Sequence, residues 1–253
     1  MDVMLVKMNV SKMVFALTAL SLSICSSVAY GDSGHGASAE TNTSQNTGLY
    51  ENTGEGDFTP PKPGTYRLPP IKSAGDGNVL DHEGRPASLK KLMAGRISIV
   101  SFIYTTCDDV KGCPMATAKL FDLHDASMAD PEIANNARLI SLSFNPKHDT
   151  PKVMKSYGYG AIADEDAAKK MPWSFLTTKS TAEINPILAQ YGQVIDQRGT
   201  GSAISHLLRV YLVDRAGQIR NIYGLGFLDQ RLLVGDIKTL LMEEAALAKN
   251  AVQ

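Results

Sequence analysis

Six of the nine residues at 96–104, with the sequence RISIVSFIY, are β-branched, aliphatic or aromatic, and the only charged one is the first. A half-exposed strand alternates apolar and polar side chains, so this nearly unbroken apolar run predicts a strand that is buried on both faces. A sheet that contains such a strand has to be covered by helices on both sides. The expected fold class is therefore α/β, with the sheet as the middle of three layers.

Strand and helix patterns alternate along the rest of the chain. Residues 78–88 predict two short edge strands with Glu83-Gly84 at the bend between them. Asp149-Thr150-Pro151 predicts a helix start, because a capping oxygen precedes a proline that suits the first turn. Pro186 is expected to kink a later helix or to delay its start. The remaining expected elements are strands at 137–144 and 173–177, helices at 114–128, 180–191 and 229–247, and a hairpin of 207–213 and 218–223. This alternation, with its late hairpin, predicts a mixed central sheet.

The N-terminus has the pattern of an export signal. Lys7 and Lys12 precede a short apolar stretch at 13–24, and small residues at 27–29 suit cleavage after Ala29. We expect residues 1–29 to be a signal peptide, which directs the protein to the periplasm or otherwise out of the cytoplasm and removes Cys25. The alternative is an uncleaved membrane anchor, although the apolar stretch is shorter than the roughly 20 residues that span a bilayer.

Residues 30–69 are predicted to be a disordered, proline-rich tether. The stretch up to residue 58 is poor in apolar residues, and five prolines follow between 59 and 70. The folded domain is expected over 70–248. The chain has 25 Lys and Arg against 26 Asp and Glu, with no basic block, which argues against nucleic-acid binding.

Cys107 and Cys113 are the candidate reactive residues. Cys107 follows the buried strand, at the sheet edge where α/β proteins place their sites, and Cys113-Pro114 opens the next helix. On one helix, residues six apart would point about 120° away from each other, so 108–112 is expected to be a loop. The helix dipole at Cys113 predicts a thiol pKa lowered to roughly 3.5–7.5. Two cysteines in an exported protein could form a structural disulfide, a redox pair or a soft-metal site, and an exposed position at this junction favours a functional pair.

Four segments resemble the SCO/SenC family of copper chaperones. These are 101–107 (SFIYTTC) with Cys113-Pro114, 144–151 (FNPKHDTP), 173–177 (WSFLT), and His206 followed by 211–214 (YLVD) and Gly217. They occur in the family's order and cover about 70–243. The sequence differs from the family pattern in two places: five residues separate the cysteines where three are usual, and Ser205 replaces the aspartate that usually precedes the histidine.

The resemblance implies a thioredoxin-like fold and a copper site, for Cu(I) or Cu(II), made of Cys107, Cys113 and His206. It also implies a metallochaperone rather than an enzyme. The client would be an exported or membrane cuproenzyme, and the family points to the dinuclear copper centre of cytochrome c oxidase. His82, His124 and His148 are expected to be surface or helix-face residues, and Met115 to line the core or a groove.

Three other readings use the same cysteines. In a thiol–disulfide oxidoreductase, one thiolate would attack a client disulfide and the other would resolve the intermediate, keeping client cysteines reduced. A thiol peroxidase fits poorly, because Val100 and Tyr104 stand where the peroxiredoxin pattern has proline and threonine. A binding module with an inert disulfide would explain neither the exposed position of the cysteine loop nor the presence of His206.

Overall fold

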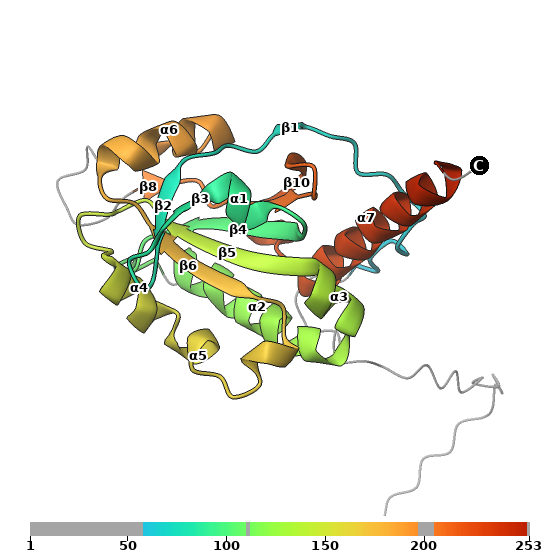
Figure 1. The fold of residues 1–253 in the computed structure, drawn as a ribbon, viewed down its shortest axis with the longest axis horizontal. Coiled ribbons are helices and arrows are strands. Elements are labelled where there is room, and N and C mark those ends of the chain that lie inside the picture. Colours follow the sequence, from blue (N-terminus) through green and yellow to red (C-terminus); the bar gives the residue numbers. More distant parts are fainter. Residues whose placement is uncertain (1–57, 110–111, 197–204, 252–253) are drawn as a thin grey trace, which may run out of the picture. The chain divides into compact units, whose positions relative to one another are not determined.

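The centre of the fold is an eight-stranded sheet with strand order β1-β10-β9-β4-β5-β6-β2-β3 (Figure 1). The computed structural model describes residues 58–109, 112–196 and 205–251, so the predicted signal peptide and most of the predicted tether lie outside the described residues. The strands are β1 (Lys72–Ser73), β2 (Asn78–Asp81), β3 (Pro86–Ser88), β4 (Ile97–Ile103), β5 (Ala137–Ser143), β6 (Trp173–Thr177), β9 (Val210–Val213) and β10 (Gln218–Tyr223). A separate two-stranded sheet joins β7 (Ile195–Asp196) and β8 (Ser205–His206).

β4 is the buried central strand that the sequence predicts. All seven of its residues are buried. It runs parallel to β5, from Ile97 opposite Ala137 to Ile103 opposite Ser143, and antiparallel to β9. β5 is also parallel to β6, so the carboxyl ends of three neighbouring strands meet at one edge of the sheet. The predicted mixed sheet is confirmed.

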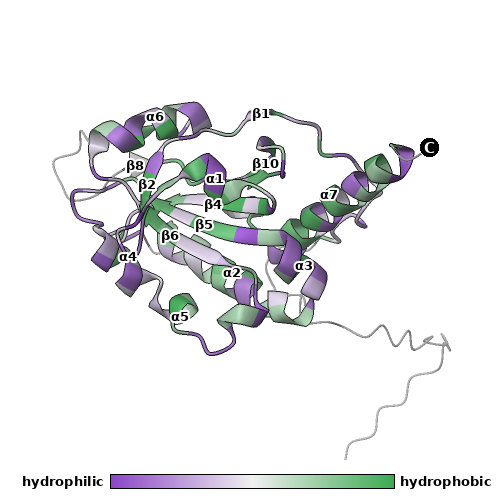
Figure 2. Ribbon diagram, viewed as in Figure 1, coloured by the Kyte–Doolittle hydropathy of each residue, from purple (hydrophilic) through white to green (hydrophobic). Residues whose placement is uncertain are grey.

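Helices cover both faces of the sheet, as a doubly buried strand requires. They are α1 (Leu89–Met93), α2 (Cys113–Ala126), α3 (Pro131–Asn136), α4 (Pro151–Tyr157), α5 (Tyr159–Ile162), α6 (Thr181–Tyr191) and α7 (Gln230–Asn250). α1 and α6 pack on the face that includes Val100 and Phe102, whereas α2 and α7 pack on the face that includes Ile97 and Ile99. Apolar residues are concentrated between these layers (Figure 2). The three-layer architecture is therefore confirmed.

The sequence predicts the long elements better than the short ones. β6 has the predicted bounds, and α2, α6 and α7 differ from prediction by only a few residues. Pro186 lies inside α6, which continues to Tyr191 and ends at Gly192 with a left-handed φ of +66°. The first hairpin strand starts at Val210 rather than at residue 207. The short helices α1, α3 and α5 were not predicted, because elements of four to six residues carry too few periodic positions to be recognised.

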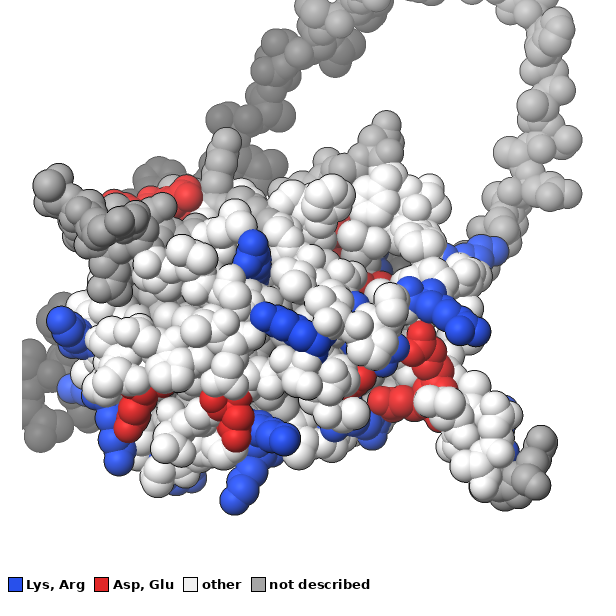
Figure 3. All heavy atoms as spheres, turned by 90° about the horizontal axis from the view of Figure 1, so that it is seen from above, with Lys and Arg blue, Asp and Glu red and all other residues white. Residues whose placement is uncertain are grey.

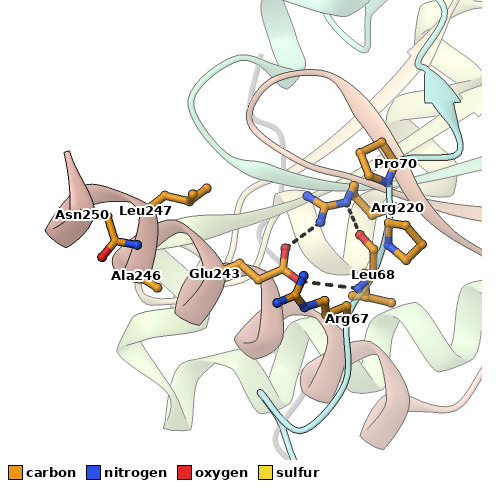
Figure 4. A pocket seen from close by; sticks show the side chains of 9 residues that line it. Arg67, Leu68, Pro70, Arg220, Glu243, Ala246, Leu247 and Asn250 are labelled. Atoms are coloured by element: carbon orange, nitrogen blue, oxygen red, sulfur yellow. Dashed lines mark hydrogen bonds and ion pairs between the residues drawn. The ribbon is translucent and has the colours of Figure 1, made fainter.

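The described chain before β1 packs along α7. The Tyr66 hydroxyl donates to Asp236 Oδ1 at 2.6 Å, the Gly64 N–H donates to Thr239 Oγ1 at 3.0 Å, and Leu68 is buried. Contacts with the domain therefore begin before residue 70. A groove of about 490 Å³ lies between residues 67–70 and the last turns of α7, next to the Arg220–Glu243 ion pair (Figure 4).

Charged side chains are spread over the face seen from above Figure 1, with broad uncharged areas between them (Figure 3). Both signs are present on that face. Within residues 58–109, 112–196 and 205–251, no helix is both long enough and apolar enough to cross a bilayer.

Asp236 is the main polar link between α7, β10 and the segment before β1. It is buried and accepts hydrogen bonds from Tyr66, Asn221 and Tyr223. We expect Asp236→Ala to lower the free energy of unfolding by about 2–4 kcal/mol, because the buried Tyr223 hydroxyl and two partly buried donors lose their acceptor. Urea denaturation would measure the change. Asp166→Ala, which breaks an exposed ion pair to Lys169, should cost less than about 1 kcal/mol, and equal losses in the two variants would contradict this account.

Candidate metal centre

Cys107 and Cys113 lie where β4 gives way to α2. Cys107 comes four residues after the end of β4, in a turn in which its N–H donates to the Tyr104 carbonyl at 3.4 Å. Cys113 is the first residue of α2, with Gly112 at the cap position and Pro114 in the first turn. The two cysteines are thus not on one helix, which confirms the prediction made from their spacing.

The two thiols are neighbours in the folded chain. Both are free thiols rather than a disulfide, and their side chains are close enough to hydrogen-bond to each other. Cys107 is half-buried and its Sγ lies 3.9 Å from the Asp109 carbonyl oxygen. Cys113 is only 1% exposed. One sulfur of the pair is therefore partly accessible, and its neighbour is buried.

The predicted low pKa of Cys113 is wrong. Burial raises the pKa of its thiol to about 12, and the neighbouring Cys107 sulfur adds to this, while the backbone at Tyr104 acts in the opposite direction. The helix terminus is present as expected. However, loss of hydration outweighs the helix dipole when a thiol is removed from water. The sequence pattern predicts that Cys113 lies at the start of a helix, but it does not predict that its thiol is buried.

The two thiols should react at different rates. At pH 8, iodoacetamide is expected to alkylate Cys107 at least about ten times faster than Cys113, because only accessible thiolates react. A time course of labelled peptides by mass spectrometry would measure both rates. In about 6 M guanidinium chloride, a concentration that unfolds most domains, the two alkylation rates should become similar. Similar rates in the folded protein would contradict the buried position of Cys113.

His206 belongs to β8, in the segment that leads into β9. Its backbone pairs with Ile195 of β7, and Val210, four residues later, pairs with Ser101 near the end of β4. The described residues thus place the His206 backbone before a strand that starts at the cysteine end of the sheet. The imidazole lies outside what the structure describes. Cys107 and Cys113 are brought together, whereas the third predicted ligand is placed by its backbone only.

Hydrogen bonds fix the segment that follows His206. The Gln193 amide donates to the Leu207 carbonyl at 2.6 Å, and Arg209 donates to the Gly192 carbonyl at 2.8 Å. The buried Tyr211 hydroxyl donates to the Tyr191 carbonyl at 3.1 Å. The end of α6 therefore anchors the chain between β8 and β9.

His124 lies on a helix, as one of the two predicted alternatives has it, but it is not a surface residue. It is 2% exposed and packs against Trp173, and burial lowers its pKa. Its ring nitrogen and the carboxylates of Asp125 and Asp164 lie within 4.8 Å of one another. Lys170 already bridges the two carboxylates, at 2.7 and 2.5 Å. His124 and Asp125 lie in α2, whereas Asp164 and Lys170 lie between α5 and β6. Together they form a paired charge cluster separate from the cysteines.

The sequence predicts Asp149 at a helix start, but it does not predict the contact that Asp149 makes with the turn before Cys107. The helix α4 is capped by the Thr150 hydroxyl, which accepts from the Val153 N–H at 3.4 Å. The Asp149 carboxylate instead accepts hydrogen bonds from Thr105, two residues before Cys107, from Ser143 and from His148. The sequence offers one signal for this role. Asp149 and Thr150 are both able to cap the same helix, and because a helix start needs only one capping side chain, the other is available for a different contact.

The comparisons with known proteins agree with this geometry. The sequence model of the SCO1/SenC family matches residues 71–242. The SCO1 protein homolog of Bacillus subtilis is 28% identical over 144 residues, which cover 56% of this chain and 69% of that protein.

Solved Sco structures share the fold. Copper-bound ScoI of Bradyrhizobium japonicum is 23% identical, with a TM-score of 0.53 over 66% of this chain and 99% of that one. BsSco, described as having a disulfide switch and as a member of the Sco family of cytochrome c oxidase assembly proteins, is 23% identical, with a TM-score of 0.54 over 69% of this chain and 98% of that one. The predicted thioredoxin-like fold is confirmed by these similarities.

Proposed function

Because the chain belongs to the SCO1/SenC family, we propose that it is a copper metallochaperone. Copper is its cargo, bound by the Cys107 and Cys113 sulfurs and the His206 imidazole. The observation that carries this proposal is the pair of neighbouring free thiols at the end of β4. The similarity to copper-bound ScoI supports the same conclusion.

The donor set suits copper on chemical grounds. Two thiolates are soft ligands and favour Cu(I) over hard cations, while an imidazole accepts Cu(I) or Cu(II). Cys107 is half-buried, so copper could leave by exchange of ligands with a protein docked at that sulfur. Such a transfer needs no turnover in the enzymatic sense.

The proposed client is an exported or membrane cuproenzyme, and specifically the copper subunit of cytochrome c oxidase. BsSco belongs to a family of assembly proteins for that enzyme. We propose that residues 1–29 direct this chain to the periplasm, or anchor it in the membrane if they are not cleaved. The part of residues 30–69 that precedes the contacts with α7 would then tether the folded domain near its client.

A Cu(I) titration tests the proposal directly. The reduced protein without its signal would be titrated anaerobically against a chromogenic Cu(I) chelator, beside a His206→Ala variant. We expect one copper per chain and at least about tenfold weaker binding in the variant, since it loses a ligand rather than an outer partner. A wild-type protein that cannot compete for Cu(I) would overturn the chaperone assignment.

Copper affinity should rise with pH. The raised pKa of Cys113, about 12, means that its proton must leave when copper binds. Each proton released strengthens apparent binding by about tenfold per pH unit below the thiol pKa. Titrations at several pH values between 6 and 8 would give the slope, and a Cys113→Ser variant should lose the part due to this thiol. A flat profile in the wild type would contradict the protonated state of the free site.

The neighbouring thiols also favour a second candidate, a thiol–disulfide oxidoreductase. The accessible Cys107 thiolate would attack a client disulfide, forming a mixed disulfide and releasing one client thiolate. Cys113 would then attack the Cys107 sulfur, releasing the second client thiolate and leaving a Cys107–Cys113 disulfide for a thiol reductant to reduce. The reduction potential of the pair decides this role. A pair more reducing than its client disulfide supports it, because electrons must pass from the pair to the client. A pair much more oxidising than the client disulfide is incompatible with keeping client cysteines reduced.

A further inference from the structure

We propose that Asp149 is a positioning residue for the cysteine loop. It holds the backbone just before Cys107 in the arrangement that brings the two sulfurs together. The copper part of this inference rests on the proposed function. The part that concerns the two thiols stands on the hydrogen bonds alone.

Every acceptor position of the Asp149 carboxylate is used. One oxygen accepts from the Thr105 hydroxyl at 2.5 Å and from His148 Nδ1 at 2.8 Å. The other accepts from the Thr105 N–H at 3.1 Å and from the Ser143 hydroxyl at 2.5 Å. A carboxylate has about four such positions, and Asp149 is completely buried. Asp149 therefore connects the end of β5 and the start of α4 to the turn after β4.

Thr105 is the point at which this network reaches the site. Both its N–H and its hydroxyl bind the same carboxylate, so its backbone and its side chain are fixed together. Cys107 is only two residues further along, and its own N–H donates to the Tyr104 carbonyl. The turn at 104–107 is thus held at its first residues by Asp149. A ligand that is held loosely loses affinity for its metal, commonly by about 10- to 100-fold.

A purely structural role for Asp149 explains less of what is observed. The start of α4 does not need this carboxylate, because Thr150 already caps the helix and Pro151 occupies its first turn. The Ser143 hydrogen bond would tie the end of β5 to Asp149 without Thr105. Only the two bonds to Thr105 lead toward the cysteines.

The test compares Asp149→Ala with two matched controls. Ser143→Ala removes a hydrogen bond from the same carboxylate but leaves Thr105 held. Asp236→Ala removes another buried carboxylate with three hydrogen-bond donors, none of them in the cysteine loop. For each variant, Cu(I) affinity, the equilibrium of the thiol pair with glutathione and the rate of Cys113 alkylation would be measured below its unfolding temperature.

We expect Asp149→Ala to bind Cu(I) at least about tenfold more weakly. Its thiol–glutathione equilibrium should shift by a similar factor, and Cys113 should be alkylated faster. Both controls should match the wild type in all three measurements, even though Asp236→Ala is destabilised. Equal values in Asp149→Ala and its controls would overturn the inference.

Two further outcomes are kept distinct. If Asp149→Ala does not fold, the Thr105→Val variant decides, because it removes the hydroxyl hydrogen bonds at a half-buried position. Copper binding should then weaken at least about threefold, which is part of the loss expected when a residue that orients a ligand is removed. An unchanged Thr105→Val would then overturn the inference. If the wild type binds no Cu(I), the proposed function fails, while the glutathione and alkylation measurements still test the positioning role.

Discussion

Replacing Cys113 by serine should weaken Cu(I) binding by more than about 100-fold, which exceeds the usual cost of losing a residue that only orients a ligand. The reason is chemical. A serine hydroxyl stays protonated and is a hard donor, so it cannot replace a thiolate on a soft ion. Competition with a chromogenic chelator would measure the loss.

The controls for this variant separate ligation from folding. Cys113 is buried, so a hydroxyl in its place costs about 1–3 kcal/mol of stability, which denaturation would report independently. Thr117→Ser alters a buried residue one turn further along α2, whose hydroxyl bonds to Tyr157 at 2.7 Å, and should leave copper affinity unchanged. Equal affinities for Cys113→Ser and the wild type would show that Cys113 is not a ligand.

The sequence predicts the frame of the site because that frame depends on local patterns. The apolar run at 96–104 predicts β4, and Cys113-Pro114 predicts the start of α2. Two side chains six positions apart on one helix point about 120° away from each other, so the spacing also predicts that the two cysteines are not on one helix. These conclusions need only neighbouring residues, and each of them is confirmed.

What the sequence does not predict depends on contacts between distant segments. The pKa of Cys113 is set by burial that comes from packing around it, and the buried His124 of α2 packs against Trp173 of β6. Asp149 reaches Thr105, 44 residues earlier in the chain. Such long-range partners leave no periodic pattern, because side chains on separate elements meet only after the sheet has formed.

Phe102→Ala should cause the largest loss of stability among the variants considered, about 3–5 kcal/mol, as expected when a buried aromatic ring is truncated in a closely packed core. Phe102 is 1% exposed in β4, and its ring makes edge contacts with Tyr191 and Tyr211, at centroid distances of 5.0 and 5.9 Å. Those partners come from α6 and β9, so the cavity would loosen two elements that pack on the central strand.

Urea denaturation would measure this change, with Tyr159→Ala as the control. Tyr159 is 67% exposed, so its loss should change the free energy of unfolding by no more than about 0.5 kcal/mol. Because Tyr211 also holds the end of α6, which anchors the segment after His206, the remaining folded Phe102→Ala protein should resist proteolysis less well near Gly192. A loss of stability no greater than that of Tyr159→Ala would mean that β4 is not the central support of the fold.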